Sequence, residues 1–153
     1  MTDETAMPTG KLTYEVLLVE DNFSDVALTR LMLKDLSAST RLTVATDGEE
    51  ALQILRSADY RPSLVILDLR MPKKSGVEVL AEMRSDSELE CLPVIIFSSS
   101  SDPAEIAQCY KLGANAYVLK PLTIRELQRV WSAIQGFWMG IALLPQRARV
   151  LAP

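Results

Sequence analysis

Residues 64–72 read LVILDLRMP, four consecutive apolar residues followed directly by an aspartate. A short continuous apolar run of this kind is typical of a strand that is buried on both faces, as in a parallel sheet covered by helices. Similar runs occur elsewhere in the chain, at residues 15–19, 42–46, 94–97 and 116–119. These runs predict a parallel sheet in which 64–67 is the third strand.

Each predicted strand is followed by a longer stretch with the helical period of about 3.6 residues. The predicted helices are residues 23–36, 48–58, 76–85, 103–112, and 124 to at least 137. Three of them begin with a capping-box pattern, namely Asp47 with Glu50, Asp102 with Glu105, and Thr123 with Glu126. Pro103 suits a first helical position, and Gly113 suits the residue after a helix. Strands that alternate with helices predict an α/β fold with a doubly wound parallel sheet.

The composition is that of an ordinary globular protein, and it excludes several kinds of site. The chain has 153 residues, a formal net charge of −4 and no histidine. Without histidine, Ser-His and Cys-His hydrolase sites are excluded, and zinc sites lose their usual ligand. A net negative charge provides no basic field for a nucleic acid backbone, so we expect no DNA binding. Cys91 and Cys109 are too few for a disulfide framework and fit reduced thiols in a cytoplasmic protein.

The two ends of the sequence differ from the middle. Residues 1–12 are acidic and short of apolar residues, so we interpret them as a flexible leader and not as a signal peptide. The apolar run at 137–144 is shorter than the roughly 20 residues that a membrane span requires, so we expect no membrane partner. We expect one domain over residues 13–138 and a C-terminal tail over 139–153 that contributes to a dimer contact.

Polar side chains follow four of the predicted strands, at the point where each strand ends. Glu20 and Asp21 follow the first strand, Asp68 the third, Ser98 the fourth and Lys120 the fifth. Open α/β sheets bind their ligands in the crevice beyond the carboxyl ends of the strands. If these four strands are neighbours, the side chains converge on one pocket. Each residue alone fits an ordinary turn, cap or solvated surface position, so only their joint placement indicates a site.

Such a pocket contains three carboxylates, which repel one another unless a cation is present. Mg²⁺ prefers oxygen ligands and is typically held by carboxylates and phosphate oxygens, so Mg²⁺ is the predicted cofactor. A carboxylate can attack phosphorus, and Asp68, alone at its strand end, is the predicted nucleophile. Glu20 and Asp21 are then better placed to hold the ion. Lys120 would contact the phosphoryl group as a point charge, and Ser98 would donate a hydrogen bond to it.

These residues resemble the receiver domains of bacterial two-component response regulators. The resemblance is carried by LLVEDN at Glu20 and Asp21, LVILDLRMP at Asp68, VIIFSSS at Ser98, and YVLKP at Lys120. It implies a flavodoxin-like (βα)5 fold with strand order 2-1-3-4-5. It also implies phosphoryl transfer from a sensor histidine kinase to Asp68, in a signalling switch that catalyses only its own phosphorylation and dephosphorylation.

The same resemblance implies three further features of the site. The backbone carbonyl of Arg70 would be a metal ligand, and the peptide between Lys120 and Pro121 would be cis. Ser98 and Tyr117 would form a switch pair. On phosphorylation, Ser98 would move toward the phosphoryl group and Tyr117 would turn inward.

Two longer segments indicate a subgroup of this family. RMPKKSGVEVLAEMRSDSELECLPVIIFSSS and FWMGIALLP resemble the single-domain regulators that partner bacterial and cyanobacterial phytochrome histidine kinases. The apolar stripe of the last helix is also longer than the sheet that it can cover, which is typical of a protein contact. We expect a homodimer through helix four, strand five, helix five and the tail, with contacts from Trp131, Ile134, Phe137 and Trp138.

Two other functions remain open from the sequence. A Mg²⁺-dependent phosphatase acting on small phosphate esters also uses an aspartate nucleophile, but it expects a second acid two residues later, where this chain has Arg70. A receiver-like scaffold that takes no phosphoryl group is the other alternative, although all the acceptor residues are present. A phosphoryl donor supplied with Mg²⁺ distinguishes the three.

Overall fold

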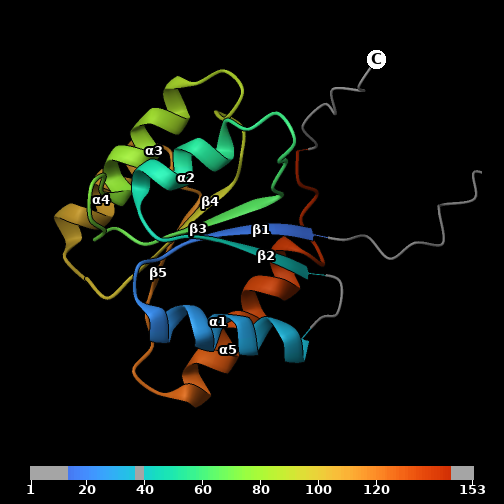
Figure 1. Ribbon diagram of the computed structural model, residues 1–153. Helices are drawn as coiled ribbons and strands as arrows, with labels where there is room; N and C mark the ends of the chain where they lie inside the picture. The colour runs from blue at the N-terminus through green and yellow to red at the C-terminus, as the bar shows by residue number, and fades with distance from the viewer. Residues whose placement is uncertain (1–13, 37–39, 146–153) are drawn as a thin grey trace, which may run out of the picture.

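A parallel sheet runs through the middle of the molecule, with helices on both of its faces (Figure 1). The computed structural model describes residues 14–36 and 40–145, so the predicted leader and the end of the predicted tail lie outside the described residues. The elements in chain order are β1 (Tyr14–Val19), α1 (Phe23–Leu36), β2 (Thr40–Ala45), α2 (Gly48–Leu55), β3 (Leu64–Leu67), α3 (Gly76–Ser85), β4 (Val94–Ser98), α4 (Pro103–Lys111), β5 (Ala116–Leu119) and α5 (Ile124–Trp138).

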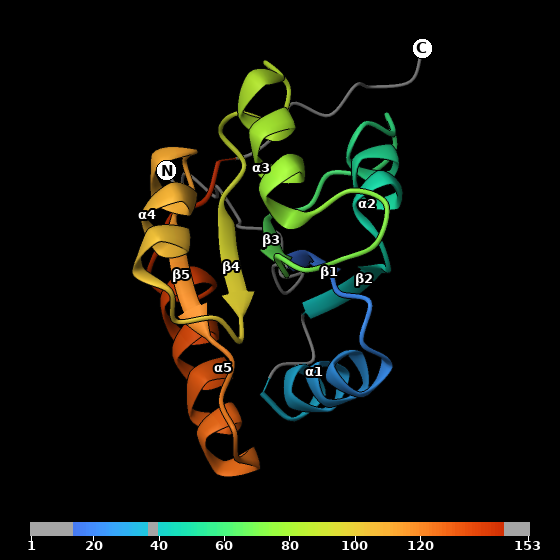
Figure 2. The same ribbon diagram turned by 90° about the vertical axis from the view of Figure 1, so that its left-hand side faces the viewer.

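The predicted fold class and strand order are confirmed. The strands lie in the order β2-β1-β3-β4-β5, and every neighbouring pair is parallel. Helices α1 and α5 cover one face of the sheet, while α2, α3 and α4 lie on the other (Figure 1, Figure 2). Among the described residues, no helix has both the length and the apolar character needed to cross a membrane.

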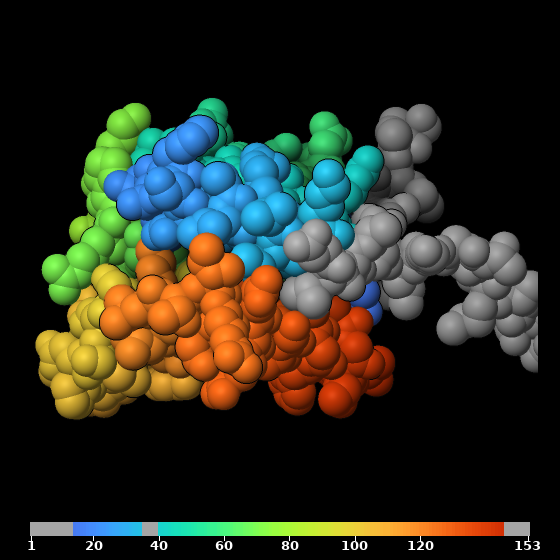
Figure 3. Space-filling model, turned by 90° about the horizontal axis from the view of Figure 1, so that it is seen from below, coloured from blue at the N-terminus to red at the C-terminus, as the bar shows by residue number. Residues whose placement is uncertain are grey.

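The sheet separates two apolar cores. Successive side chains of a strand point to opposite faces, so β1 contributes Leu17 and Val19 to one core and Val16 and Leu18 to the other. This is why the buried strands are continuous apolar runs and show no alternation with polar residues. On the face shown in Figure 3, α1 and α5 lie side by side over the second core.

Helix α5 uses one side of its apolar stripe for this second core. Trp131 is 0% exposed and Ile134 is 6% exposed, and the Trp131 ring packs edge-on against Phe97 with ring centroids 5.7 Å apart. The prediction that Trp131 and Ile134 form a dimer contact is therefore wrong, because their side chains are buried within the monomer. Trp138 also packs partly against this core, whereas Phe137 is 50% exposed.

Several predicted ends differ from the structure by a few residues. Helix α2 ends at Leu55, because Arg56 takes the cap position and the Ser57 N–H donates back to the Ile54 carbonyl. Strand β2 ends at Ala45, because Thr46 instead donates from its backbone N and its Oγ1 to the Glu50 carboxylate at the start of α2.

All three predicted capping residues, Asp47, Asp102 and Thr123, are N-caps in the structure. Asp47 and Thr123 accept hydrogen bonds from the backbone N–H groups of Glu50 and Glu126. Asp102 caps α4 by accepting from Ala104 N, at 3.0 Å, so its predicted pairing with Glu105 is wrong although the cap itself is present. The Glu105 carboxylate instead accepts from the Ser100 hydroxyl. Gly113 follows α4 with φ of 100°, a conformation that favours glycine after a helix.

Gly76 allows α3 to begin directly against the loop that carries Asp68. Its backbone N–H donates to the Leu69 carbonyl at 2.9 Å. A Cβ at this position would lie 2.2 Å from the backbone oxygen of Asp68. No side chain fits there without moving the main chain next to the predicted phosphoacceptor.

We expect Gly76→Ala to lower the free energy of unfolding by about 1–3 kcal/mol, because backbone must shift to relieve the overlap. Gly136→Ala is the control, since a Cβ at this exposed position of α5 meets nothing within 4 Å. It should raise the free energy of unfolding by roughly 0.5–1 kcal/mol, because alanine favours a helix interior over glycine. Urea unfolding followed by circular dichroism measures both. Equal losses for the two variants would contradict this account.

Candidate functional site

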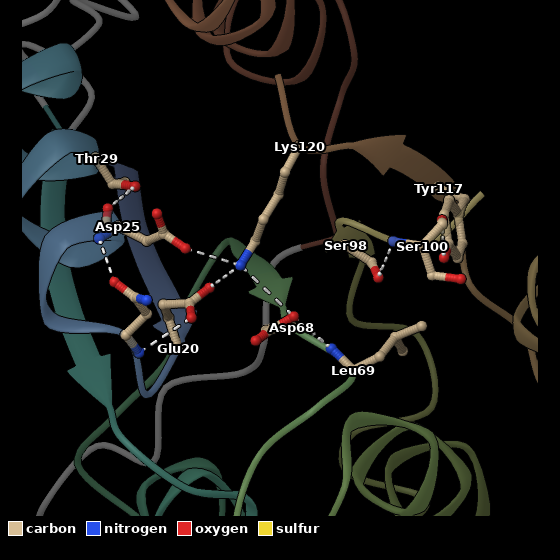
Figure 4. A network of polar contacts seen from close by, with 10 residues as sticks. Glu20, Asp25, Thr29, Asp68, Leu69, Ser98, Ser100, Tyr117 and Lys120 are labelled. Carbon is tan, nitrogen blue, oxygen red and sulfur yellow. Dashed lines mark hydrogen bonds and ion pairs between the residues drawn. The ribbon is translucent and has the colours of Figure 1, made fainter. Parts of the chain in front are cut away.

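The predicted site residues are held by backbone hydrogen bonds that extend the sheet beyond its strands. Glu20 N donates to Ala45 O, and Asp68 N donates to Val19 O at 3.0 Å. Lys120 N donates to Ser98 O at 2.7 Å. Because these bonds continue the parallel ladders, the side chains that follow β1, β3 and β5 leave the same edge of the sheet. Figure 4 shows Glu20, Asp68 and Lys120 pointing toward one another.

Three carboxylates gather in this pocket. Glu20, Asp21 and Asp68 each offer an oxygen, and these oxygens all lie within 4.8 Å of one another. Glu20 and Asp68 are only 2% and 8% exposed, whereas Asp21 is exposed to solvent. This donor set fits a hard divalent cation, which prefers carboxylate oxygens and retains bound waters on an open side. Arg70, whose backbone carbonyl was predicted as another ligand, follows Asp68 by two residues.

The pocket raises the pKa values of its two buried acids. Burial raises the pKa of Glu20 to about 7, helped by the charge of Asp68, and the hydrogen bond from Lys120 only partly opposes this effect. Burial likewise raises the pKa of Asp68, with the negative charge of Asp21 adding to it, while the positive charge of Lys120 opposes the rise. Loss of contact with water is the main cause of both rises, and Lys120 offsets only part of it.

Lys120 is the cation of the pocket. Its closest partners are Glu20 and Asp25, whereas the sequence predicted a contact with a phosphoryl group on Asp68. Its Nζ lies 2.8 Å from Glu20 Oε2, 3.0 Å from Asp25 Oδ2 and 3.7 Å from Asp68 Oδ1. Burial alone would lower the pKa of Lys120, but the bonds to Glu20 and Asp25 and the charge of Asp68 together raise it. Asp25 was missed from the sequence, because an acid in the first turn of a helix is common without any further role.

The predicted cis peptide between Lys120 and Pro121 is wrong. No peptide bond among the described residues is cis. The trans form is the intrinsically preferred isomer even before proline. The long, flexible lysine side chain reaches Glu20 and the acids beside it from this trans backbone.

Ser98 and Tyr117 both contact Ser100, in the loop between β4 and α4. Ser98 is 1% exposed, and its Oγ accepts a hydrogen bond from Ser100 N at 3.1 Å. The Tyr117 hydroxyl donates to the Ser100 carbonyl at 2.7 Å (Figure 4). The two residues of the predicted switch pair are thus connected through one loop residue, which the sequence did not single out.

The loop after Asp68 is connected to the same region through Arg70. The Arg70 guanidinium, which is 75% exposed, lies 3.8 Å from the Glu105 carboxylate at the start of α4. Glu105 also accepts from the Ser100 hydroxyl, at 2.6 Å. Glu105 therefore joins the loop after β3 to the loop after β4. The sequence marked it only as part of a helix cap.

Comparison with known protein sequences agrees with the resemblance to receiver domains. The sequence model of the response regulator receiver domain family matches residues 16–131. Response regulator Rcp1 of Synechocystis sp. is 33% identical over 135 residues, which cover 85% of this chain and 92% of that protein.

Solved structures agree with the sequence relatives. The phosphorylated cyanobacterial phytochrome response regulator RcpA is 35% identical with a TM-score of 0.84, and the match covers 88% of this chain and 99% of that one. The Mn²⁺-bound form of Rcp1 is 32% identical with a TM-score of 0.81, covering 86% of this chain and 99% of that one. The chain belongs to the response regulator receiver domain family and is a phosphoryl acceptor of two-component signalling.

Proposed function

We propose that Asp68 accepts the phosphoryl group, from a phosphohistidine of a sensor kinase and with Mg²⁺ in the pocket. The observation that carries this assignment is the convergence of Glu20, Asp21 and Asp68 around one point, with the Lys120 ammonium 3.7 Å from Asp68 Oδ1. An oxygen of Asp68 forms the new bond to phosphorus, the P–N bond to the kinase histidine breaks, and the imidazole leaves with that electron pair.

Glu20, Asp21, Asp68 and the backbone carbonyl of Arg70 would hold the ion. Bound Mg²⁺ would neutralise the carboxylates and draw negative charge from the transferring phosphoryl group. The family relative solved with Mn²⁺ supports a divalent ion in such a pocket. Lys120 donates to a phosphoryl oxygen or to Asp68, and its compact ammonium group suits a site where the acceptor changes position. The Ser98 hydroxyl donates a hydrogen bond to another phosphoryl oxygen.

The chain acts as a switch and catalyses only its own phosphorylation and dephosphorylation. The Ser98 hydroxyl accepts from Ser100 N and keeps its own proton to donate, so a movement of Ser98 toward a phosphoryl oxygen would pull on the loop that carries Ser100. Tyr117 then follows, since its hydroxyl is bonded to the Ser100 carbonyl. The changed surface around α4 and β5 alters the affinity for a protein partner.

The cognate kinase is a phytochrome, and the protein works in the cytoplasm without binding DNA. This part of the proposal is supported by likeness to the cyanobacterial phytochrome response regulator named above. A net charge of −4 is consistent with a protein partner and with no DNA contact. Phe23 begins α1, and Leu122 and Ile124 follow Lys120 closely in the chain; these exposed apolar side chains are the surface on which the kinase docks.

A homodimer forms through α4, β5, α5 and the tail. The apolar side chains that remain exposed on these elements support this contact, including Tyr110, Leu119, Phe137, Ile141 and Leu143. Phe137, near the end of α5, and Ile141, in the tail, are 50% and 74% exposed, and a second copy of the chain would bury them.

Incubation with Mg²⁺ and acetyl phosphate tests the phosphoacceptor. We expect the intact mass of the wild type to increase by one phosphoryl group. The control Asp59→Asn, which removes an exposed carboxylate in the loop after α2, should show the same increase. Asp68→Asn should stay unmodified, because the amide oxygen is a poor nucleophile. Steady turnover of small phosphate esters would favour a phosphatase instead, and an unmodified wild type with an intact fold would favour a scaffold.

The pH dependence of stability follows from Glu20. Its pKa is 4.5 in the unfolded reference and about 7 in the folded pocket, so the folded state binds more protons between these values. Without metal, the free energy of unfolding should therefore fall as the pH rises from about 5 to about 8. Asp68, whose pKa is raised too, acts in the same direction. Glu20→Gln should make this fall smaller, because one of the two proton-binding acids is gone.

Urea unfolding in EDTA at several pH values measures this slope. Asp59→Asn is again the control and should keep the wild-type slope, since it removes an exposed carboxylate outside the pocket. A Glu20→Gln variant as steep as the wild type would show that burial of this acid does not control the pH dependence.

Light scattering tests the dimer. Phe137→Ala should lower the weight-average mass at a given concentration, because the half-exposed ring would be buried only in the dimer. The control is Phe23→Ala, the same substitution at an exposed ring of α1 outside the proposed contact. A mass that Phe137→Ala leaves unchanged would exclude this contact.

A further inference from the structure

Asp25 occupies a fixed position in the first turn of α1. Its backbone N–H donates to Asn22 Oδ1 at 3.0 Å, and its carbonyl accepts from the Thr29 hydroxyl at 2.8 Å. Asn22 is itself tied to the pocket, since its N–H donates to Glu20 Oε1 at 3.1 Å. The Asp25 side chain therefore starts from a backbone that is connected by hydrogen bonds to the acidic pocket.

The Asp25 carboxylate and the Lys120 ammonium form one of the shortest ion pairs of the site. Asp25 Oδ2 lies 3.0 Å from Lys120 Nζ, closer than Asp68 Oδ1 at 3.7 Å (Figure 4). The Lys120 side chain is only 17% exposed, and its Nζ also lies 6.0 Å from the centre of the Phe97 ring. A lysine enclosed on several sides has little freedom left, unlike the lysines of ordinary surface ion pairs.

Asp25 differs from Glu20, the other close partner of Lys120, in one respect. Glu20 is part of the three-carboxylate cluster that fits a divalent ion, and Asp25 is not. When Glu20 serves the ion, Asp25 is the partner that stays with Lys120. An ammonium group has three N–H donors, so one bond to Asp25 leaves two for Asp68 and a phosphoryl oxygen.

We propose that Asp25 is a positioning residue that holds the Lys120 ammonium in place for phosphoryl transfer to Asp68. It rests on the proposed function, in which Lys120 contacts the transferring group. Asp25 touches neither the phosphoryl group nor the ion. It acts by restricting where Nζ can lie, because small errors in the position of a charged donor weaken its interaction with the transition state.

The first test needs no phosphorylation. In the wild type with ¹⁵N-labelled lysine, the Lys120 ammonium protons should exchange slowly with water and give an NMR signal, because carboxylates bind them. The control Asp59→Asn should keep this signal, and Asp25→Asn should lose or shift it. A signal that Asp25→Asn leaves unchanged would show that Asp25 does not hold the lysine.

The second test measures phosphorylation by acetyl phosphate over a range of Mg²⁺ concentrations. Asp25→Asn should lower the rate at saturating Mg²⁺ on the order of tenfold, about the effect of one hydrogen bond to a charged group. Asp25→Glu should restore most of this rate, because it returns a carboxylate to a partly exposed position. Circular dichroism shows whether each variant is folded.

The outcomes separate the two proposals. A wild type that Mg²⁺ and acetyl phosphate fail to modify would overturn the proposed function. A wild type that is modified, with Asp25→Asn equally fast, would overturn only the positioning role. If Asp25→Asn regained the wild-type rate at high Mg²⁺, Asp25 would act only through the general negative field, and the positioning role would also be overturned.

Discussion

The structure depends on a charge imbalance at the carboxyl edge of the sheet. The ammonium of Lys120 lies between 2.8 and 3.7 Å from a carboxylate oxygen of each of Glu20, Asp25 and Asp68. Asp21 lies beside Glu20 and Asp68. Buried charges are costly unless they are paired, and here the negative groups outnumber the positive one. Burial is the main cause of the raised pKa values of Glu20 and Asp68, and the neighbouring negative charges add to it. A protein selected only for stability would not keep such a cluster beside an apolar core, so the cluster indicates function.

Hydrogen bonds and an ion pair join the loops after β3 and β4 to residues of α4 and β5. One connection runs from Ser98 through Ser100 to Tyr117, by hydrogen bonds of 3.1 Å and 2.7 Å. The other runs from Arg70 to Glu105, which also binds the Ser100 hydroxyl. Both connections meet at Ser100, at the loop that leads into α4. Under the proposed function, a phosphoryl group on Asp68 that binds Ser98 would act on the start of α4 through these short contacts.

The sequence predicts the features that depend on neighbours in the chain. The apolar runs, the caps at Asp47 and Thr123 and the acids at the strand ends are all local signals, and the structure contains them. The features that depend on distant contacts were not predictable in this way. Asp25 has the local pattern of an ordinary first-turn acid, and its pairing with Lys120 joins residues 95 positions apart. The stripe of α5 shows which residues are apolar, but only packing against Phe97 separates the buried Trp131 from the exposed Phe137.

The backbone explains how an acidic cluster can persist in a well-packed domain. Glu20, Asp68 and Lys120 each donate their backbone N–H to a neighbouring chain segment at the edge of the sheet. Their main chain is fixed by the same bonds that hold the strands, and Leu67 and Val19 just before them are fully buried. Electrostatic repulsion is therefore confined to side chains, where the Lys120 ammonium relieves part of it and a bound cation would relieve the rest. Because the repulsion acts where the fold is already secured, the pocket can change its charge while the apolar cores on the two faces of the sheet stay intact.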